Sequence, residues 1–137
     1  MSKLLGILFV LISVGGMFYF SNQTAIVSSI QSQFFIDLFY KLFRIRISSF
    51  VIRKLAHVFM FMMISISITL LVYVFFNNIL LSIGISIITS VGYACLDEYI
   101  QTFINGRSGN IRDVIIDSIG VIIGILITGG ILWIKRK

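Results

Sequence analysis

Four long apolar runs dominate the pattern of hydrophobic and polar positions along the chain. They extend over residues of about 4–20, 55–76, 79–96 and 114–134. Each is close to the roughly 20 residues that a helix needs to cross about 30 Å of hydrocarbon. Only Asn77 and Asn78 separate the second run from the third, so these two form an antiparallel hairpin. The pattern predicts four transmembrane helices with both chain termini on one side of the membrane.

The segment between the first two runs has a different pattern. Polar side chains recur there at helical spacing, and most positions between them are aromatic or aliphatic: Gln33, Asp37, Lys41 and Arg44 against Phe34, Phe35, Leu38, Phe39, Leu42 and Phe43. This predicts an amphipathic helix over about 30–46, with Asp37 and Lys41 as an i,i+4 pair. Such a helix lies flat in the headgroup layer or packs against the mouth of the bundle.

Composition supports a membrane protein and argues against a soluble one. Of the 137 residues, 58% are hydrophobic and only 12% are charged, whereas soluble domains average about a quarter charged residues. The length predicts a single domain, residues 1–137. The net charge of +6 comes from basic residues that flank apolar runs, which argues against nucleic acid as a partner. Anionic lipid headgroups or lipid-linked phosphates are the partners that this distribution favours. The predicted fold class is therefore an all-α membrane bundle.

More than half of the ionisable side chains lie near one end of the predicted bundle. They and a neighbouring glutamine occupy the start of the second run, the end of the third, and the loop and first turns that lead into the fourth: Arg53, Lys54, His57, Asp97, Glu98, Gln101, Arg107, Arg112, Asp113 and Asp117. Four crossings bring these segments to the same side of the membrane. Charges at a membrane boundary are costly to dehydrate and are usually kept for a function. This polar end is the predicted functional site.

The start of the fourth run indicates which face of its predicted helix points into the bundle. Asp113 and Asp117 are one helical turn apart, and Gly120 and Gly124 continue the same face. A pair of small residues at this spacing lets another helix approach closely. We therefore expect both aspartates to face the interior of the bundle.

The loop before the fourth run, residues 105–110, is a polar turn with two glycines. Its backbone N–H groups, together with Arg107, are suited to an anion. The fourth helix begins immediately afterwards, so the positive end of its dipole faces the same place.

Three roles are open to the acids and His57: binding a divalent metal, general acid–base chemistry, or a structural network that neutralises the arginines. In the structural reading, Glu98 pairs with Arg53 or Lys54, and the two aspartates pair with Arg112 or Arg53. The sequence has no HExxH, no GxSxG and no cysteine spacing typical of a metal site. These residues alone specify no reaction, metal or cofactor.

The same residues resemble the VanZ-like family of small bacterial membrane proteins. The matching pieces are Arg53-Lys54-Leu55-Ala56-His57, Asp97-Glu98-Tyr99-Ile100-Gln101-Thr102-Phe103, Gly106-Arg107-Ser108-Gly109, and Asp113-Val114-Ile115-Ile116-Asp117-Ser118-Ile119-Gly120 with Gly124. More loosely, Ser21-Asn22-Gln23 and Ser28 are similar to the family's segment rich in serine and glutamine. The chain departs from the family where an acid often follows the histidine, because Val58 and Phe59 follow His57 here.

The resemblance implies a multi-pass protein of the bacterial cytoplasmic membrane, with a cell-envelope role associated with resistance to teicoplanin and related glycopeptides. We expect it to bind an anionic headgroup or a lipid-linked wall precursor. If the protein is a catalyst, acid–base roles fall to His57, Glu98, Asp113 and Asp117, and binding roles fall to Arg53, Lys54, Asp97, Gln101, Arg107 and Arg112. Two alternatives are an intramembrane enzyme acting on a lipid phosphate or ester, and a module that regulates another envelope protein. Protein partners are then an envelope protein or a second copy of the chain.

Overall fold

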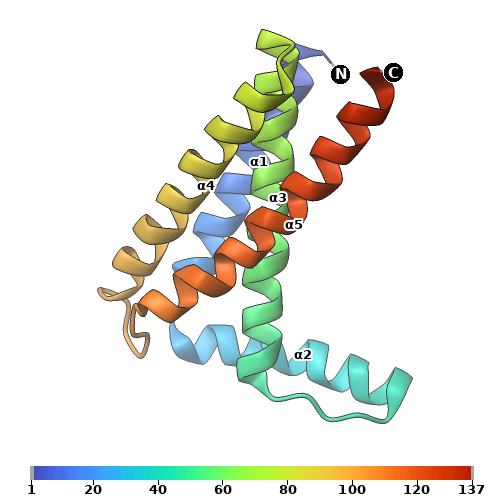
Figure 1. Ribbon diagram of the computed structural model, residues 1–137. Helices are drawn as coiled ribbons and strands as arrows, with labels where there is room; N and C mark the ends of the chain where they lie inside the picture. The colour runs from blue at the N-terminus through green and yellow to red at the C-terminus, as the bar shows by residue number, and fades with distance from the viewer. Residues whose placement is uncertain (1, 137) are drawn as a thin grey trace.

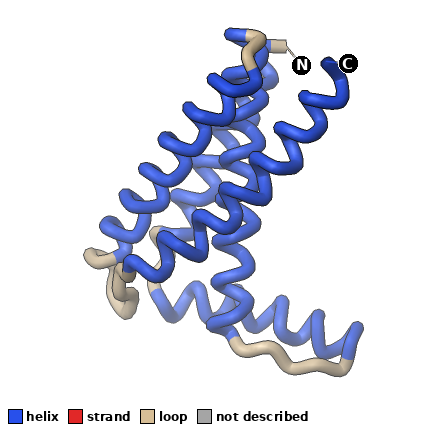
Figure 2. Tube along the Cα trace, in the orientation of Figure 1, coloured by secondary structure: helices blue, strands red, loops and turns tan. Residues whose placement is uncertain are grey.

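The computed structural model describes residues 2–136, and within that range the chain is helical and contains no strand (Figure 2). The five helices are α1 (Lys3–Ser21), α2 (Ala25–Phe43), α3 (Ser49–Phe76), α4 (Ile79–Gln101) and α5 (Ile111–Arg136). Four of them, α1, α3, α4 and α5, are long and apolar enough to cross a membrane. The predicted all-α bundle with four membrane helices is confirmed.

The polar residues between the apolar runs act as helix caps. Ser48 Oγ accepts a hydrogen bond from the backbone N–H of Val51 at the start of α3, and Asn78 Oδ1 accepts one from Leu81 at the start of α4. Such caps satisfy backbone donors that have no partner inside the helix. Asn77 ends α3 in the left-handed region with φ 50°, a conformation that asparagine tolerates better than most residues. Two asparagines therefore suffice to reverse the chain.

Both termini lie at one end of the bundle, and α2 lies across the other end (Figure 1). The α4–α5 loop is at the same end as α2. Helix α3 is central, because it contacts each of the other four helices. The arrangement brings the polar segments of α3, α4 and α5 together, as the crossing pattern predicts.

Close packing of α5 on α3 depends on two glycines. A Cβ on Gly120 would collide with the carbonyl oxygen of Val58, and one on Gly124 would collide with Ser65 Oγ and the carbonyl oxygen of Met62. Since lipid tails give little hydrophobic drive for helix association, such close contacts supply much of the packing energy. The small-residue face predicted for the fourth run is the face that α5 presents to α3.

Both α3 and α4 extend beyond the predicted apolar runs at the polar end. Helix α3 begins at Ser49 rather than near Leu55, and α4 continues to Gln101 rather than ending near Leu96. The runs were bounded by hydrophobicity, but polar side chains facing a bundle interior do not end a helix. The extra turns place the charged residues on rigid helices.

Helix α2 presents one face to the bundle. Ser28 and Ser32 on that face are buried, whereas Phe39 and Phe43 farther along are exposed. The helix starts earlier than predicted, at Ala25. It also ends earlier, at Phe43, because Arg44 adopts a left-handed conformation with φ 58°. The predicted pairing of Asp37 with Lys41 is wrong within the described residues, since Asp37 Oδ1 accepts from Gln33 Nε2 at 2.9 Å.

Candidate functional site

A buried group of four side chains lies inside the polar end of the bundle. His57 comes from α3, Asp97 and Glu98 from α4, and Asp117 from α5. One nitrogen or carboxylate oxygen from each residue lies within 4.8 Å of those of the other three. The three acids are only 2%, 4% and 1% exposed, respectively. We call these four residues the buried cluster.

Gln101 fixes the position of Asp97 in this cluster. Its side-chain Nε2 donates one hydrogen bond to Asp97 Oδ2 at 2.8 Å and another to Ser21 Oγ at 3.0 Å. Both donors of the amide nitrogen are then used. Because Gln101 and Ser21 are also buried, this short chain of bonds ties the end of α1 to the end of α4.

The α4–α5 loop fixes the position of Glu98. The backbone N–H of Asn110 donates to Glu98 Oε2 at 2.9 Å, and Asn110 Oδ1 accepts from the backbone N–H of Arg112 at 3.0 Å. Gly109 makes this possible, because a Cβ there would collide with the backbone carbonyl of Glu98. Asn110 thus caps α5 and holds a buried carboxylate at the same time.

Several polar atoms of the buried cluster have no hydrogen bond although they lie close to one another. His57 Nδ1 lies 3.4 Å from Asp117 Oδ1. Among the residues that the structure describes, His57 Nδ1, Glu98 Oε1 and both carboxylate oxygens of Asp117 have no hydrogen-bond partner. Buried polar groups are rarely left in this state, since their desolvation is not otherwise offset.

A polar pocket lies beside the cluster at the mouth of the bundle. Its lining comes from the start of α3, the end of α4, the α4–α5 loop and the first turn of α5: Phe50, Arg53, Lys54, His57, Gln101, Gly106, Arg107, Ser108 and Asp113. Lys54 Nζ and Asp113 Oδ2 form an ion pair at 2.5 Å. Within residues 2–136, neither Arg53 nor Arg107 forms an ion pair with a carboxylate.

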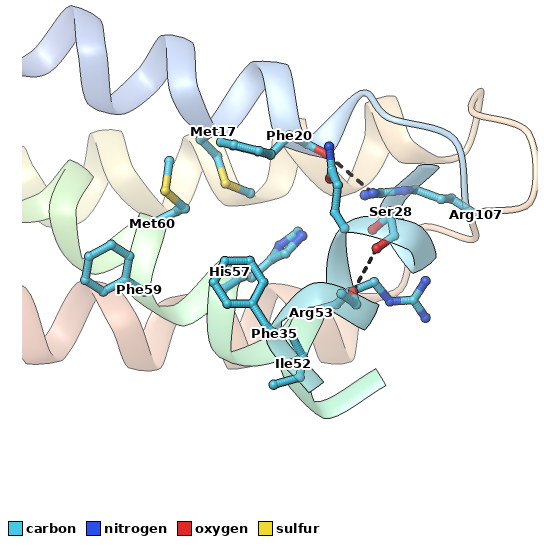
Figure 3. Close-up of a pocket in the computed structure, with 13 residues that line it drawn as sticks. Met17, Phe20, Ser28, Phe35, Ile52, Arg53, His57, Phe59, Met60 and Arg107 are labelled. Atoms are coloured by element: carbon cyan, nitrogen blue, oxygen red, sulfur yellow. Dashed lines mark hydrogen bonds between the residues drawn. The ribbon is translucent and has the colours of Figure 1, made fainter. Parts of the chain in front are cut away.

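An apolar groove continues from the polar pocket, between α1, α2 and α3. It is lined by Met17, Phe20, Ser28, Gln31, Ser32, Phe35, Ile52, Arg53, Ala56, His57, Phe59, Met60 and Arg107. Figure 3 shows Arg53 and Arg107 at the end nearest α2, and Phe59 and Met60 farther into the bundle. Arg53, His57 and Arg107 line both spaces, so the polar pocket and the apolar groove meet at these three side chains.

The two arginines influence each other. Burial, followed by the positive charge of Arg53, lowers the pKa of the Arg107 guanidinium from its usual value. Arg107 also donates a hydrogen bond from Nη2 to the backbone carbonyl of Phe20 at 3.4 Å. Arg107 is therefore a partly desolvated cation that an anion would stabilise.

The structure brings together most, but not all, of the residues singled out in the sequence. His57, Glu98 and Asp117 meet in the buried cluster, and Asp97 joins them instead of lining the polar pocket. Asp113 faces the polar pocket and pairs with Lys54, rather than with Arg112 or Arg53. The ion pair of Glu98 with Arg53 or Lys54, which the structural alternative predicted, is absent from the described residues.

Two further residues have roles that the sequence pattern did not assign. Asn110 and Ser21 hold Glu98 and Gln101, as described above. Asn110 stands in the predicted polar turn, and Ser21 stands in the segment that resembles the family only loosely. Within the described part of the chain, Arg112 lines neither the polar pocket nor the apolar groove, and it is exposed.

Four apolar helices around a polar end define a multi-pass α-helical membrane protein. A family model described as VanZ/LLP1 matches residues 6–133, which is nearly the whole chain. The chain belongs to the VanZ/LLP1 family. No curated protein and no solved structure matched it.

Proposed function

We propose that this protein binds an anionic amphiphile, with its phosphate headgroup in the polar pocket and an acyl chain in the apolar groove. The observation that carries the proposal is that the two spaces meet at Arg53, His57 and Arg107. A molecule with a charged head and an apolar tail is the ligand that matches such a junction. At the end of a membrane bundle, lipids are the ready source of such molecules.

The charges favour an anion over a zwitterion. Two guanidinium groups face the junction, whereas the nearby lysine is already paired with Asp113. Planar guanidinium groups match the oxygens of a phosphate, with which they form paired hydrogen bonds. A bound phosphate would offset the mutual repulsion of Arg53 and Arg107.

The cellular role we infer is in the envelope of a bacterium, at the cytoplasmic membrane. Membership of the VanZ/LLP1 family supports a membrane protein of this kind. Binding a lipid-linked wall intermediate would change how much of it is available to glycopeptides. The protein would thereby lower susceptibility to teicoplanin.

Lipid binding is tested with purified full-length protein and phosphatidylglycerol as the anionic probe. Retained lipid is counted by native mass spectrometry during titration, with phosphatidylcholine as the zwitterionic comparison. The test variant combines Arg53→Gln with Arg107→Gln. The matched control is Arg112→Gln, which removes an exposed arginine outside the polar pocket and the apolar groove. We expect the double variant to weaken phosphatidylglycerol binding by about tenfold or more, and the control by less than about twofold. Equal binding of the two lipids, or equal losses in both variants, would refute the proposal.

The envelope role is tested separately in a glycopeptide-sensitive Gram-positive host. Wild type, the double arginine variant and Arg112→Gln are expressed at matched membrane levels, and teicoplanin inhibitory concentrations are measured. Protection by the wild type and by Arg112→Gln, with loss in the double variant, is the expected result. If the wild type binds phosphatidylglycerol but gives no protection, the lipid site stands and the glycopeptide role is wrong.

The buried cluster favours a second function, an intramembrane enzyme acting on a lipid phosphate or ester. His57 and Asp117 are adjacent, and Glu98 lies close to both, which is an arrangement suited to proton transfer. Here Glu98→Gln, nearly equal in shape, should abolish release of phosphate or fatty acid from a lipid while lipid binding persists. Detection of no product from the wild type with either class of lipid would leave only the binding function.

A further inference from the structure

We propose that His57, Asp97, Glu98 and Asp117 form a binding site for one divalent transition-metal ion, Zn²⁺ or Mn²⁺. The inference goes beyond lipid binding and does not depend on it. Its basis is the convergence of one imidazole and three carboxylates from three helices, with donor atoms within 4.8 Å of one another. No other side chains contribute to this group in the described part of the chain.

The unpaired atoms identify the centre of the site. Asp117 is 1% exposed, yet neither of its carboxylate oxygens has a hydrogen-bond partner among the described residues. Glu98 Oε1 and His57 Nδ1 are in the same state there. Burial of carboxylate oxygens that accept no hydrogen bond is costly, and buried charges are normally paired or coordinate a metal. A cation between these atoms satisfies all of them at once.

Hydrogen bonds on the outer side of the cluster prepare it for an ion. Asp97 Oδ2 is held by Gln101 and Glu98 Oε2 by the backbone of Asn110, so these bonds leave the second oxygen of each carboxylate unused. Metal ligands in proteins are commonly oriented by such an outer shell of hydrogen bonds. The arrangement therefore has both the inner donors and the supporting contacts of a metal site.

The spacing is compatible with coordination after a small contraction. Zinc binds nitrogen and oxygen at about 2.0–2.2 Å, which places neighbouring ligand atoms in a tetrahedral site roughly 3.4 Å apart. His57 Nδ1 and Asp117 Oδ1 are already separated by 3.4 Å. Rotation of the Asp97 and Glu98 side chains would bring their carboxylate oxygens to the same distance.

The donor set selects the class of metal. Carboxylates alone would suit Mg²⁺ or Ca²⁺, but an imidazole nitrogen favours first-row transition metals. A mixture of one imidazole and three carboxylates is therefore suited to Zn²⁺ or Mn²⁺. The ion would reach the site through the polar pocket, which His57 also lines.

The test uses the purified full chain in detergent, stripped with a chelator and titrated with ZnCl₂, MnCl₂ or MgCl₂. Bound metal is measured by elemental analysis after desalting, and affinity by calorimetry. Asp117→Asn removes a ligand charge with almost no change in shape, and Glu98→Gln does the same on another helix. Asp37→Asn is the matched control, because it removes an exposed carboxylate on α2 that accepts a hydrogen bond from Gln33 and lies outside the cluster, the polar pocket and the apolar groove. Circular dichroism and gel filtration verify that each variant is folded.

We expect the wild type to bind one Zn²⁺ or Mn²⁺ per chain and to be stabilised against heat by it. Asp117→Asn and Glu98→Gln should each lose about tenfold or more in affinity, and Asp37→Asn less than about twofold. A wild type that binds neither ion stoichiometrically would overturn the proposal. So would equal losses in all three folded variants, or Mg²⁺ binding as tight as that of the transition metals. If one variant fails to fold, the other decides the result.

Discussion

The backbone N–H of Asn110 donates to Glu98 Oε2 across 2.9 Å, so the loop that begins α5 holds a carboxylate that belongs to α4. Loop and helix can approach this closely only because residue 109 has no side chain. The bond occupies one oxygen of Glu98, and the other is buried without a hydrogen bond in a residue that lies beside His57, Asp97 and Asp117. A turn that looks like a simple connection is therefore part of the candidate site.

The first prediction concerns Gly109. In Gly109→Ala the new methyl group would meet the backbone carbonyl of Glu98 and the Thr102 side chain. The loop must then move outward and the Asn110–Glu98 bond is lost. We expect destabilisation of about 1–3 kcal/mol, measured by thermal unfolding in detergent followed by circular dichroism.

Gly92→Ala is the control for that experiment. Gly92 lies on α4, and within the described residues no atom outside the neighbouring backbone of α4 stands within 4 Å of the place its Cβ would take. Alanine there should be neutral or stabilising by up to about 1 kcal/mol, because it has the higher helix propensity. Equal unfolding temperatures for the two variants would show that the loop tolerates a side chain at position 109.

The fold was largely predictable from the sequence, because the lengths of the apolar runs and the two-asparagine turn determine the topology. The interior face of α5 was predictable too, since Gly120 and Gly124 follow the two aspartates at helical spacing. The pairing of the charged side chains was not predictable from the sequence. Lys54 rather than an arginine pairs with Asp113, because pairing depends on helix rotation and on side-chain reach.

The same limit explains what was missed in the candidate site. The residues that follow His57 on α3 include no acid, but the carboxylate nearest His57 comes from α5. The histidine therefore has an acidic neighbour on another helix. Asn110 acts through its backbone N–H, which every residue except proline possesses, so no side-chain pattern indicates it. Ser21 meets Gln101 only because α1 ends beside the end of α4.

The second prediction concerns Gln101, which orients Asp97. Gln101→Leu keeps a similar volume but removes the donors to Asp97 and Ser21. If the buried cluster binds Zn²⁺, affinity should fall by about 10- to 100-fold, as for other outer-shell contacts, while one ion per chain is still bound at saturation. Calorimetric titration measures this. Gln23→Leu, which removes a partly buried glutamine whose side chain bonds only to the carbonyl of Tyr19 in the described residues, should leave Zn²⁺ affinity unchanged.

The third prediction concerns the contact of α5 with α3. Gly120→Ala places a methyl group against the carbonyl oxygen of Val58, so the two helices must separate. A lower unfolding temperature is expected, since membrane helices depend on close packing. Gly130→Ala on the same helix is the comparison, because no described atom outside the neighbouring backbone of α5 lies within 4 Å of that Cβ position. An unchanged unfolding temperature for Gly120→Ala would contradict the packing shown here.

The fourth prediction concerns the Lys54–Asp113 ion pair. The two side chains are 21% and 19% exposed, so water screens the pair in part. A double-mutant cycle with Lys54→Met and Asp113→Asn should give a coupling energy of about 0.2–1 kcal/mol, from denaturant or thermal unfolding. A coupling energy of zero would mean that the contact adds nothing to stability.

The last prediction concerns the face that α2 turns toward the membrane. Phe39 follows Ser32 by seven residues, which places it on the face that points toward the bundle. Ser32 is covered by the bundle, but Phe39 is farther along α2 and is exposed. We therefore expect Phe39 to enter the hydrocarbon beside the bundle, while Lys41 on the opposite face meets water.

Tryptophan fluorescence in lipid vesicles distinguishes the two faces. In a Trp133→Phe background, which removes the only native tryptophan, Phe39→Trp should emit at shorter wavelength and be quenched strongly by brominated lipid tails. Lys41→Trp should be quenched by a water-soluble quencher instead. Equal exposure of both positions to water would mean that α2 stands clear of the bilayer, and its phenylalanines would then be available to a protein partner.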